Sequence, residues 1–175
     1  QNLGPKISYD NSEFNSNFLP ANLKIGTGFD FIFDDFNKIA VNVEFNKLLV
    51  PTPQRGIDLN GDGIVNNEDS TIAKSDYESI GWTSGVLKSF GDAPDGMSEE
   101  LKEFTYALGA EYLYQDSFAM RMGYFHESPE KGARQFFSLG AGFKYTTIKV
   151  DVSYLFSASK VRNPLENTLR FSLTF

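Results

Sequence analysis

The sequence predicts an all-β fold, a transmembrane antiparallel β-barrel. Three observations predict it: apolar and polar residues alternate along many short segments, aromatic residues make up 15 % of the chain, and short turns alternate with long loops. Barrel strands that cross a membrane alternate in this way because one side of the sheet faces lipid and the other faces the lumen. From that alternation we expect about eight strands.

A first β-hairpin is expected near the amino terminus. Apolar side chains occupy alternate positions in residues 23–33, and the alternation resumes in residues 39–45 after a polar turn at 34–37. Two such segments joined by a short turn are typical of a hairpin. A weaker opening strand is expected at residues 5–9.

The same pattern predicts two more hairpins and a final strand. The hairpins pair residues 104–114 with 118–124 and 137–145 with 148–156, and the final strand is 169–175. The mean hydropathy of −0.31 is compatible with a membrane barrel, because only half of each strand faces lipid. No apolar run reaches the roughly 18 residues that a membrane-spanning helix needs.

A soluble β-sandwich or a lipocalin-like barrel is the alternative, with the apolar face turned inward to a core. Two features favour the membrane. The polar face carries glycines and charges of both signs, which suits a narrow lumen. Aromatic residues also gather at strand ends, as in girdles at the lipid headgroups. These aromatic residues are Tyr112, Tyr114, Tyr124, Tyr145, Tyr154 and Phe156.

The alternation of short turns and long loops predicts an orientation in the bacterial outer membrane. Outer-membrane barrels place short turns in the periplasm and long loops outside the cell. We therefore expect a periplasmic carboxyl terminus, where the final Phe175 resembles the terminal-strand signal for insertion. The chain is expected to be part of one domain, residues 1–175. The expected extracellular loops are residues 11–17, 51–101, 127–135 and 157–167.

Charge and residue content exclude several classes of protein. The formal net charge of −7 argues against a nucleic-acid partner, because phosphate binding needs a basic surface. The chain has no cysteine, so it offers no disulfide or thiolate site. His126 is the single histidine and has no evident partner for base catalysis, and no nucleophile or phosphate-binding motif is present. We expect that the protein is not an enzyme.

A calcium-type loop is expected at residues 58–69, within the long loop. Oxygen donors occupy positions 1, 3, 5, 9 and 12, and position 7 offers a backbone carbonyl, a pattern that suits a calcium ion. The last donor is an aspartate, as in dockerin loops, and calcium would stiffen the loop. The alternative is an ordinary Asp/Asn/Gly turn. The expected ligands are Asp58, Asn60, Asp62, Ile64, Asn66 and Asp69.

The end of the same loop is rich in apolar residues for a segment expected in water. Loops of this length usually have a function. A docking surface for a partner, or a plug over the barrel mouth, is one interpretation; a small core within the loop is the other. The candidate partner-binding residues are Ile80, Trp82, Val86, Leu87 and Phe90.

Several longer motifs resemble the PorV family, also called LptO. They are residues 4–9 (GPKISY), 31–35 (FIFDD), 46–53 (NKLLVPTP), 89–94 (SFGDAP) and 98–103 (SEELKE). The resemblance extends over the whole chain, except that the calcium-type loop looks like an insertion.

The resemblance implies a function and a fold. PorV proteins belong to the type IX secretion system of Bacteroidota and are similar to the fourteen-stranded FadL barrels, so this chain would be the carboxyl-terminal part of such a barrel. It would shuttle cargo that bears a C-terminal signal domain from the outer-membrane translocon to the surface attachment complex. A FadL-like transporter of hydrophobic solutes and a small structural or adhesive barrel are the alternatives.

Overall fold

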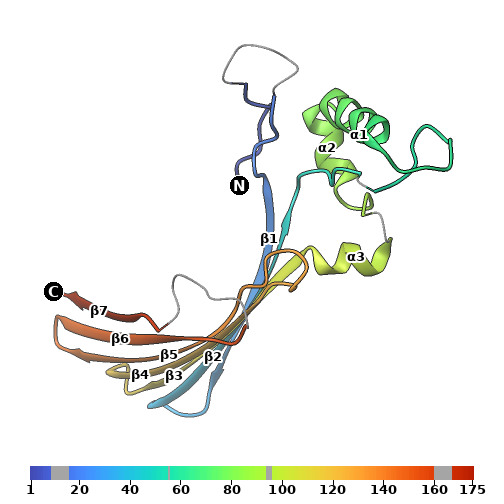
Figure 1. Cartoon of the computed structure of the whole chain (residues 1–175). Coiled ribbons are helices and arrows are strands. Elements are labelled where there is room, and N and C mark those ends of the chain that lie inside the picture. The colour runs from blue at the N-terminus through green and yellow to red at the C-terminus, as the bar shows by residue number, and fades with distance from the viewer. Residues whose placement is uncertain (9–15, 55, 94–95, 160–166) are drawn as a thin grey trace. The chain divides into compact units, whose positions relative to one another are not determined.

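A computed structural model describes residues 1–8, 16–54, 56–93, 96–159 and 167–175 (Figure 1). Within these residues the chain forms a seven-stranded sheet in the order β1-β2-β3-β4-β5-β6-β7, and three helices lie between β2 and β3. The strands are β1 (Asn22–Ile32), β2 (Asn37–Leu48), β3 (Phe104–Tyr114), β4 (Phe118–His126), β5 (Gln135–Tyr145), β6 (Ile148–Ser157) and β7 (Leu169–Thr174). The helices are α1 (Asn67–Ser79), α2 (Trp82–Lys88) and α3 (Met97–Lys102).

The residues group into two compact units. The first unit contains residues 1–23 and 47–101, and the second contains residues 24–46 and 102–175. The helices fall almost entirely in the first unit and most of the sheet in the second. The helices were not predicted, because residues 51–101 were expected to be a loop.

The sheet confirms the expected antiparallel meander. Each of the strands β3 to β6 pairs antiparallel with the next one along the chain, so the sheet is built from neighbours in sequence. Short turns join the strands where the sequence predicted them. At the β3–β4 turn, Gln115 and Asp116 adopt positive φ, and at the β5–β6 turn Thr146 does so. In the described part of the chain, β1 and β7 are the two edges of the sheet, which is open.

The expected opening strand at residues 5–9 is not a strand over the residues described. Ile7 forms a single antiparallel bridge with Asn17, through two backbone hydrogen bonds of 2.9 Å. Tyr9 lies outside the described residues. The strand count is therefore seven in the described residues, where about eight were expected from alternation.

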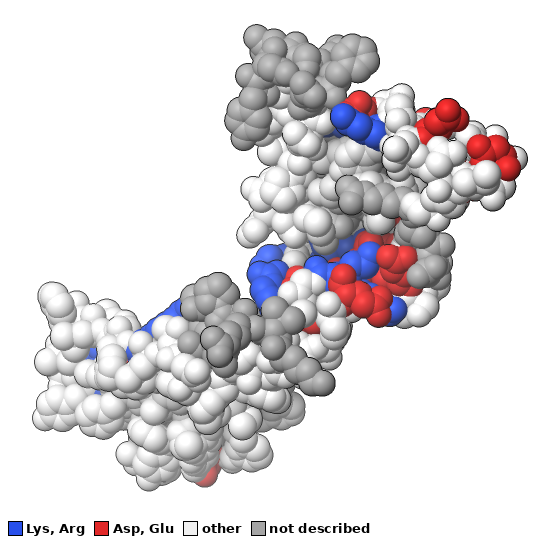
Figure 2. Space-filling model, viewed as in Figure 1, with Lys and Arg blue, Asp and Glu red and all other residues white. Residues whose placement is uncertain are grey.

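One face of the sheet exposes its apolar side chains. Phe171 is 72 % exposed, and Met122 and Phe143 of the same face are also exposed. Apart from Pro51 of the first unit, the buried hydrophobic residues of the described chain are alanines, so the sheet covers no core of large side chains. Much of the surface that Figure 2 shows over the sheet is free of charged side chains. No described helix is long and apolar enough to cross a membrane.

The first unit is held together around the Phe18 ring. The ring packs edge-on against Tyr77 of α1 at a centroid distance of 5.2 Å, and the Lys6 ammonium lies 4.4 Å from its centre. The same ammonium donates a hydrogen bond of 2.7 Å to the Glu78 carbonyl. Gly85 of α2 is buried against Phe18, and an added Cβ would lie 2.5 Å from the ring. The amino-terminal segment is thereby packed onto α1 and α2.

Candidate functional site

An ion network lies on the polar face of the sheet. Glu111 of β3 and Asp151 of β6 both accept from the Arg121 guanidinium of β4, and the Arg121 Nη1 to Asp151 Oδ1 distance is 2.6 Å. Lys149 lies 3.5 Å from the other Asp151 oxygen. Opposite charges therefore neutralise one another on this face.

Small residues make room for this network. A Cβ at Gly142 of β5 would lie 2.5 Å from Asp151 Oδ1 and 2.9 Å from Arg121 Nη1. The guanidinium thus passes over the β5 backbone to reach β6. The sequence pattern of glycines and charges on one face was correct, but it did not predict which charges would pair.

Aromatic residues gather where strands β3 to β5 meet the long loops. The Tyr106 ring stacks on the His126 ring at 4.6 Å between centroids, and Tyr124 packs on Phe137 at the same distance. The Tyr124 hydroxyl lies 3.1 Å from Nδ1 of His126. The histidine is therefore part of an aromatic cluster, with no carboxylate beside it in the described contacts.

Ion pairs fix the β4–β5 loop. Arg134 donates two hydrogen bonds of 2.7 and 2.8 Å to the Glu127 carboxylate, and these bonds hold the pKa of Glu127 below its usual value. Lys131 pairs with Glu103 at 3.2 Å, and Lys102 pairs with Glu130 at 2.8 Å. The Ser128 carbonyl also accepts from three amides of the loop. The expected extracellular loop at 127–135 is thus an ordered one.

Five of the six expected calcium ligands lie in a loop that leads directly into α1, and the sixth, Asp69, lies in the first turn of that helix. Asp62 Oδ2 accepts from the side-chain amides of Asn60 at 3.1 Å and of Asn66 at 3.5 Å. The Asn66 amide also lies 3.4 Å from the Ile64 carbonyl. Four of the expected ligands therefore converge. Among the described residues, however, no three Asp, Glu, His or Cys side chains form a cluster that could hold a metal ion.

The other two expected ligands bind the loop's own amides. Asp58 accepts from the Gly61 and Gly63 amides, each at 2.7 Å. Asp69 is 2 % exposed and accepts from the Asn66, Leu59 and Asn60 amides, which keep its pKa below the usual value. Asn66 and Asp69 also form the capping box of α1. This exchange of hydrogen bonds satisfies free amides at the helix start.

The candidate partner-binding residues fall into two groups. Leu87 is 74 % exposed and Phe90 is exposed as well, while Ile80, Trp82 and Val86 are half-buried. The Phe90 ring lies 5.9 Å from the Lys47 ammonium. The segment therefore contains an exposed group and a half-buried group.

A buried ion pair near this segment was not predicted. Lys47 at the end of β2 and Glu100 of α3 lie 2.5 Å apart, and their side chains are 1 % and 6 % exposed. The alternation of residues in β2 does not predict that Lys47 is buried, because the helix α3 that covers it lies far along the chain. No sequence signal available in a single chain would have identified the pair.

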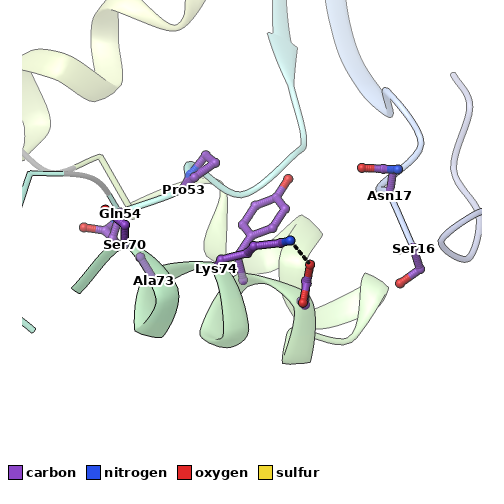
Figure 3. Close-up of a pocket in the computed structure, with 9 residues that line it drawn as sticks. Ser16, Asn17, Pro53, Gln54, Ser70, Ala73 and Lys74 are labelled. Carbon is purple, nitrogen blue, oxygen red and sulfur yellow. Dashed lines mark ion pairs between the residues drawn. The ribbon is translucent and has the colours of Figure 1, made fainter. Parts of the chain in front are cut away.

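A cavity of about 690 Å³ lies between the amino-terminal segment and α1 (Figure 3). Asn17, Gln54 and Ser70 contribute polar groups, and the Lys74–Glu78 ion pair of 3.6 Å borders it, drawn as the dashed line. Tyr77 also lines it, and burial together with the charge of Asp92 raises the pKa of its hydroxyl. No pattern in the sequence predicts this cavity.

One family model matches the amino-terminal part of the chain. Residues 1–55 match the family model described as type IX secretion system protein PorV. No curated protein matches the chain. Three of the predicted motifs, at 4–9, 31–35 and 46–53, lie in the matched part, and the two later motifs lie beyond it. The predicted resemblance to the PorV family of type IX secretion system proteins is therefore confirmed over residues 1–55.

Proposed function

We propose that this chain is part of an outer-membrane β-barrel that shuttles cargo in type IX secretion. The observation that carries a role in this secretion system is the PorV match over residues 1–55. In the proposed function the extracellular loops receive the C-terminal signal domain of a cargo protein at the translocon. They then deliver the cargo to the surface attachment complex.

The exposed apolar face supports the membrane part of the proposal. Ile25, Phe29 and Phe31 of β1 are exposed, and Leu169, Phe171 and Leu173 repeat the pattern on β7. An apolar face that extends across a whole sheet is far larger than the scattered apolar groups of a soluble surface. Hydrocarbon solvates such a face without cost.

The strand order indicates what would close the barrel. In an antiparallel meander of seven strands, β1 and β7 run in the same direction. An antiparallel closure therefore needs an odd number of further strands between these two edges. Unpaired edges are not stable in hydrocarbon, because their amides and carbonyls find no water. The fourteen-stranded barrel that the resemblance implies meets this condition, whereas closure of these strands on themselves would need a parallel pair.

Leu87 is the residue that best tests partner binding by the loop. It is exposed on α2, whereas Trp82 is half-buried and the Phe90 ring contacts Lys47. We expect Leu87→Ser to reduce recovery of translocon and cargo proteins when the protein is affinity-purified from native membranes in mild detergent. Burial of a large apolar side chain is favourable, so a polar replacement at a contact weakens binding.

Leu3→Ser is the matched control, because Leu3 is also an exposed leucine of the first unit. It should leave co-purification unchanged. If Leu87→Ser recovers as much translocon and cargo protein as the wild type does, this surface is not the partner-binding one. If the wild-type protein recovers no secretion component at all, the shuttle function itself is wrong.

We also propose that the loop at residues 58–69 binds calcium. The Asn66 side-chain nitrogen lies 3.5 Å from Asp62 Oδ2 and 3.4 Å from the Ile64 carbonyl oxygen, so a calcium ion in that position would meet two oxygen ligands. Calcium takes six or more such oxygens. The Asp58 and Asp69 carboxylates keep lone pairs beside those used by the loop amides. Bound calcium would stiffen the loop and the start of α1.

A further inference from the structure

Helix α3 exposes two large apolar side chains on one side. Met97 is 75 % exposed and Leu101 is 65 % exposed, and residues four apart lie on the same face of a helix. Glu100 between them is buried against Lys47. The helix is therefore fixed on one side by an ion pair, with its apolar residues directed outward.

The chain continues from this helix into a strand whose apolar face is the proposed lipid-facing one. Helix α3 ends at Lys102 and β3 begins at Phe104. Three residues span at most about 10 Å, so chain length alone keeps Leu101 close to Phe104. Tyr106 follows on β3 and belongs to the aromatic cluster with His126. Such clusters lie at the level of the lipid headgroups.

We propose that Met97 and Leu101 insert into the outer leaflet of the membrane that holds the strands. This inference rests on the proposed membrane function, and it assigns α3 to the boundary between headgroups and acyl chains. Apolar side chains of a helix lying in that boundary are buried several ångströms deep. The helix would fix the depth at which β3 enters the bilayer.

The absence of cysteine makes a direct test possible, since a single introduced thiol can be labelled without background. Met97→Cys and Leu101→Cys would each be labelled with bimane in the full-length protein in proteoliposomes that contain brominated lipids. Leu108→Cys on the lipid-facing side of β3 is the membrane reference, and Ser75→Cys on exposed α1 is the water reference. Emission is compared with that in unbrominated lipids.

We expect a loss of bimane emission at positions 97 and 101 comparable to that at 108, and no loss at 75. Loss at 108 without loss at 97 and 101 would overturn the inference and leave the membrane function intact. No loss at any position would overturn both. If iodide in water quenches positions 97 and 101 as strongly as 75, these side chains lie in solvent and the inference is likewise wrong.

Discussion

Arg121 of β4 reaches Asp151 of β6 by passing over Gly142 of β5. The Nη1 to Oδ1 distance is 2.6 Å, and a Cβ at Gly142 would lie 2.5 Å from that carboxylate oxygen. The absence of a side chain on the middle strand thus allows an ion pair between strands that are not neighbours. Gly142 positions the pair.

Replacement of this glycine should destabilise the sheet. We expect Gly142→Ala to lower the free energy of unfolding by about 1–3 kcal/mol, because the Cβ forces the ion pair apart. Gly109→Ala is the matched control on the same face, where an added Cβ meets nothing within 4 Å. Gly109→Ala should raise the free energy of unfolding by about 0.5 kcal/mol, because alanine loses less backbone entropy than glycine on folding. Urea titration in detergent micelles measures both, and equal effects would contradict this role of Gly142.

Gly85→Ala should loosen α2 from the amino-terminal segment. The added Cβ would lie 2.5 Å from the Phe18 ring and 3.3 Å from Pro51, and the expected cost is about 1–3 kcal/mol for overpacking. Trp82 of α2 is the single tryptophan of the chain, so its emission reports on this helix. We expect the fluorescence emission of Trp82 to shift to longer wavelength in Gly85→Ala. Gly91→Ala, where a Cβ meets nothing within 4 Å, should cause none.

The Lys47–Glu100 pair should show the behaviour of a buried ion pair. We expect Lys47→Met to cost about 3–5 kcal/mol, because it leaves a carboxylate buried without its counter-ion. The double variant Lys47→Met with Glu100→Gln should recover much of that loss. Lys102→Met breaks the more exposed pair with Glu130 and should cost less than about 1 kcal/mol. A double variant no more stable than Lys47→Met alone would show that the charge pair is not the cause.

Acid should weaken the β4–β5 loop through Glu127. The pKa of this carboxyl is below the ordinary 4.5, chiefly because Arg134 donates hydrogen bonds to it, so ionisation favours the folded state. Its contribution is complete above the unfolded value of 4.5 and is lost as the pH falls through the lower folded value. Glu127→Gln should remove this part of the pH dependence, measured as unfolding free energy between neutral pH and pH 3. An unchanged pH profile would exclude Glu127 as its source.

Calcium should stabilise the loop at residues 58–69. Added calcium is expected to raise the midpoint of thermal unfolding and to protect the loop from protease, and a chelator should reverse both effects. Asp62→Ala removes the carboxylate where the amides converge and should abolish the response. Asp76→Asn on α1 is the control, because it lies outside the loop and is exposed. A calcium response that survives Asp62→Ala would mean that the ion binds elsewhere.

The strands could be predicted closely because each is specified by neighbours along the chain. Alternation at 148–156 predicted β6, which is Ile148–Ser157, and alternation at 104–114 predicted β3 with the same bounds. A side chain's face depends only on its position along the strand, so period two is visible in the sequence. The helices were missed. Asn66 and Asp69 form a capping box, but both were already assigned to a calcium loop.

The sequence by itself determined which side chains lie on each face of the sheet, where the turns fall and, through residues 1–55, the resemblance to the PorV family. Only the tertiary structure decided that Lys47 meets Glu100, that Phe18 packs on Gly85 and that Arg121 spans β5 to reach Asp151. Alternation and turns are local, because backbone geometry repeats over a few residues. Pairing between distant residues depends on strand register and on how a long inserted segment folds back, and neither is contained in the order of nearby residues.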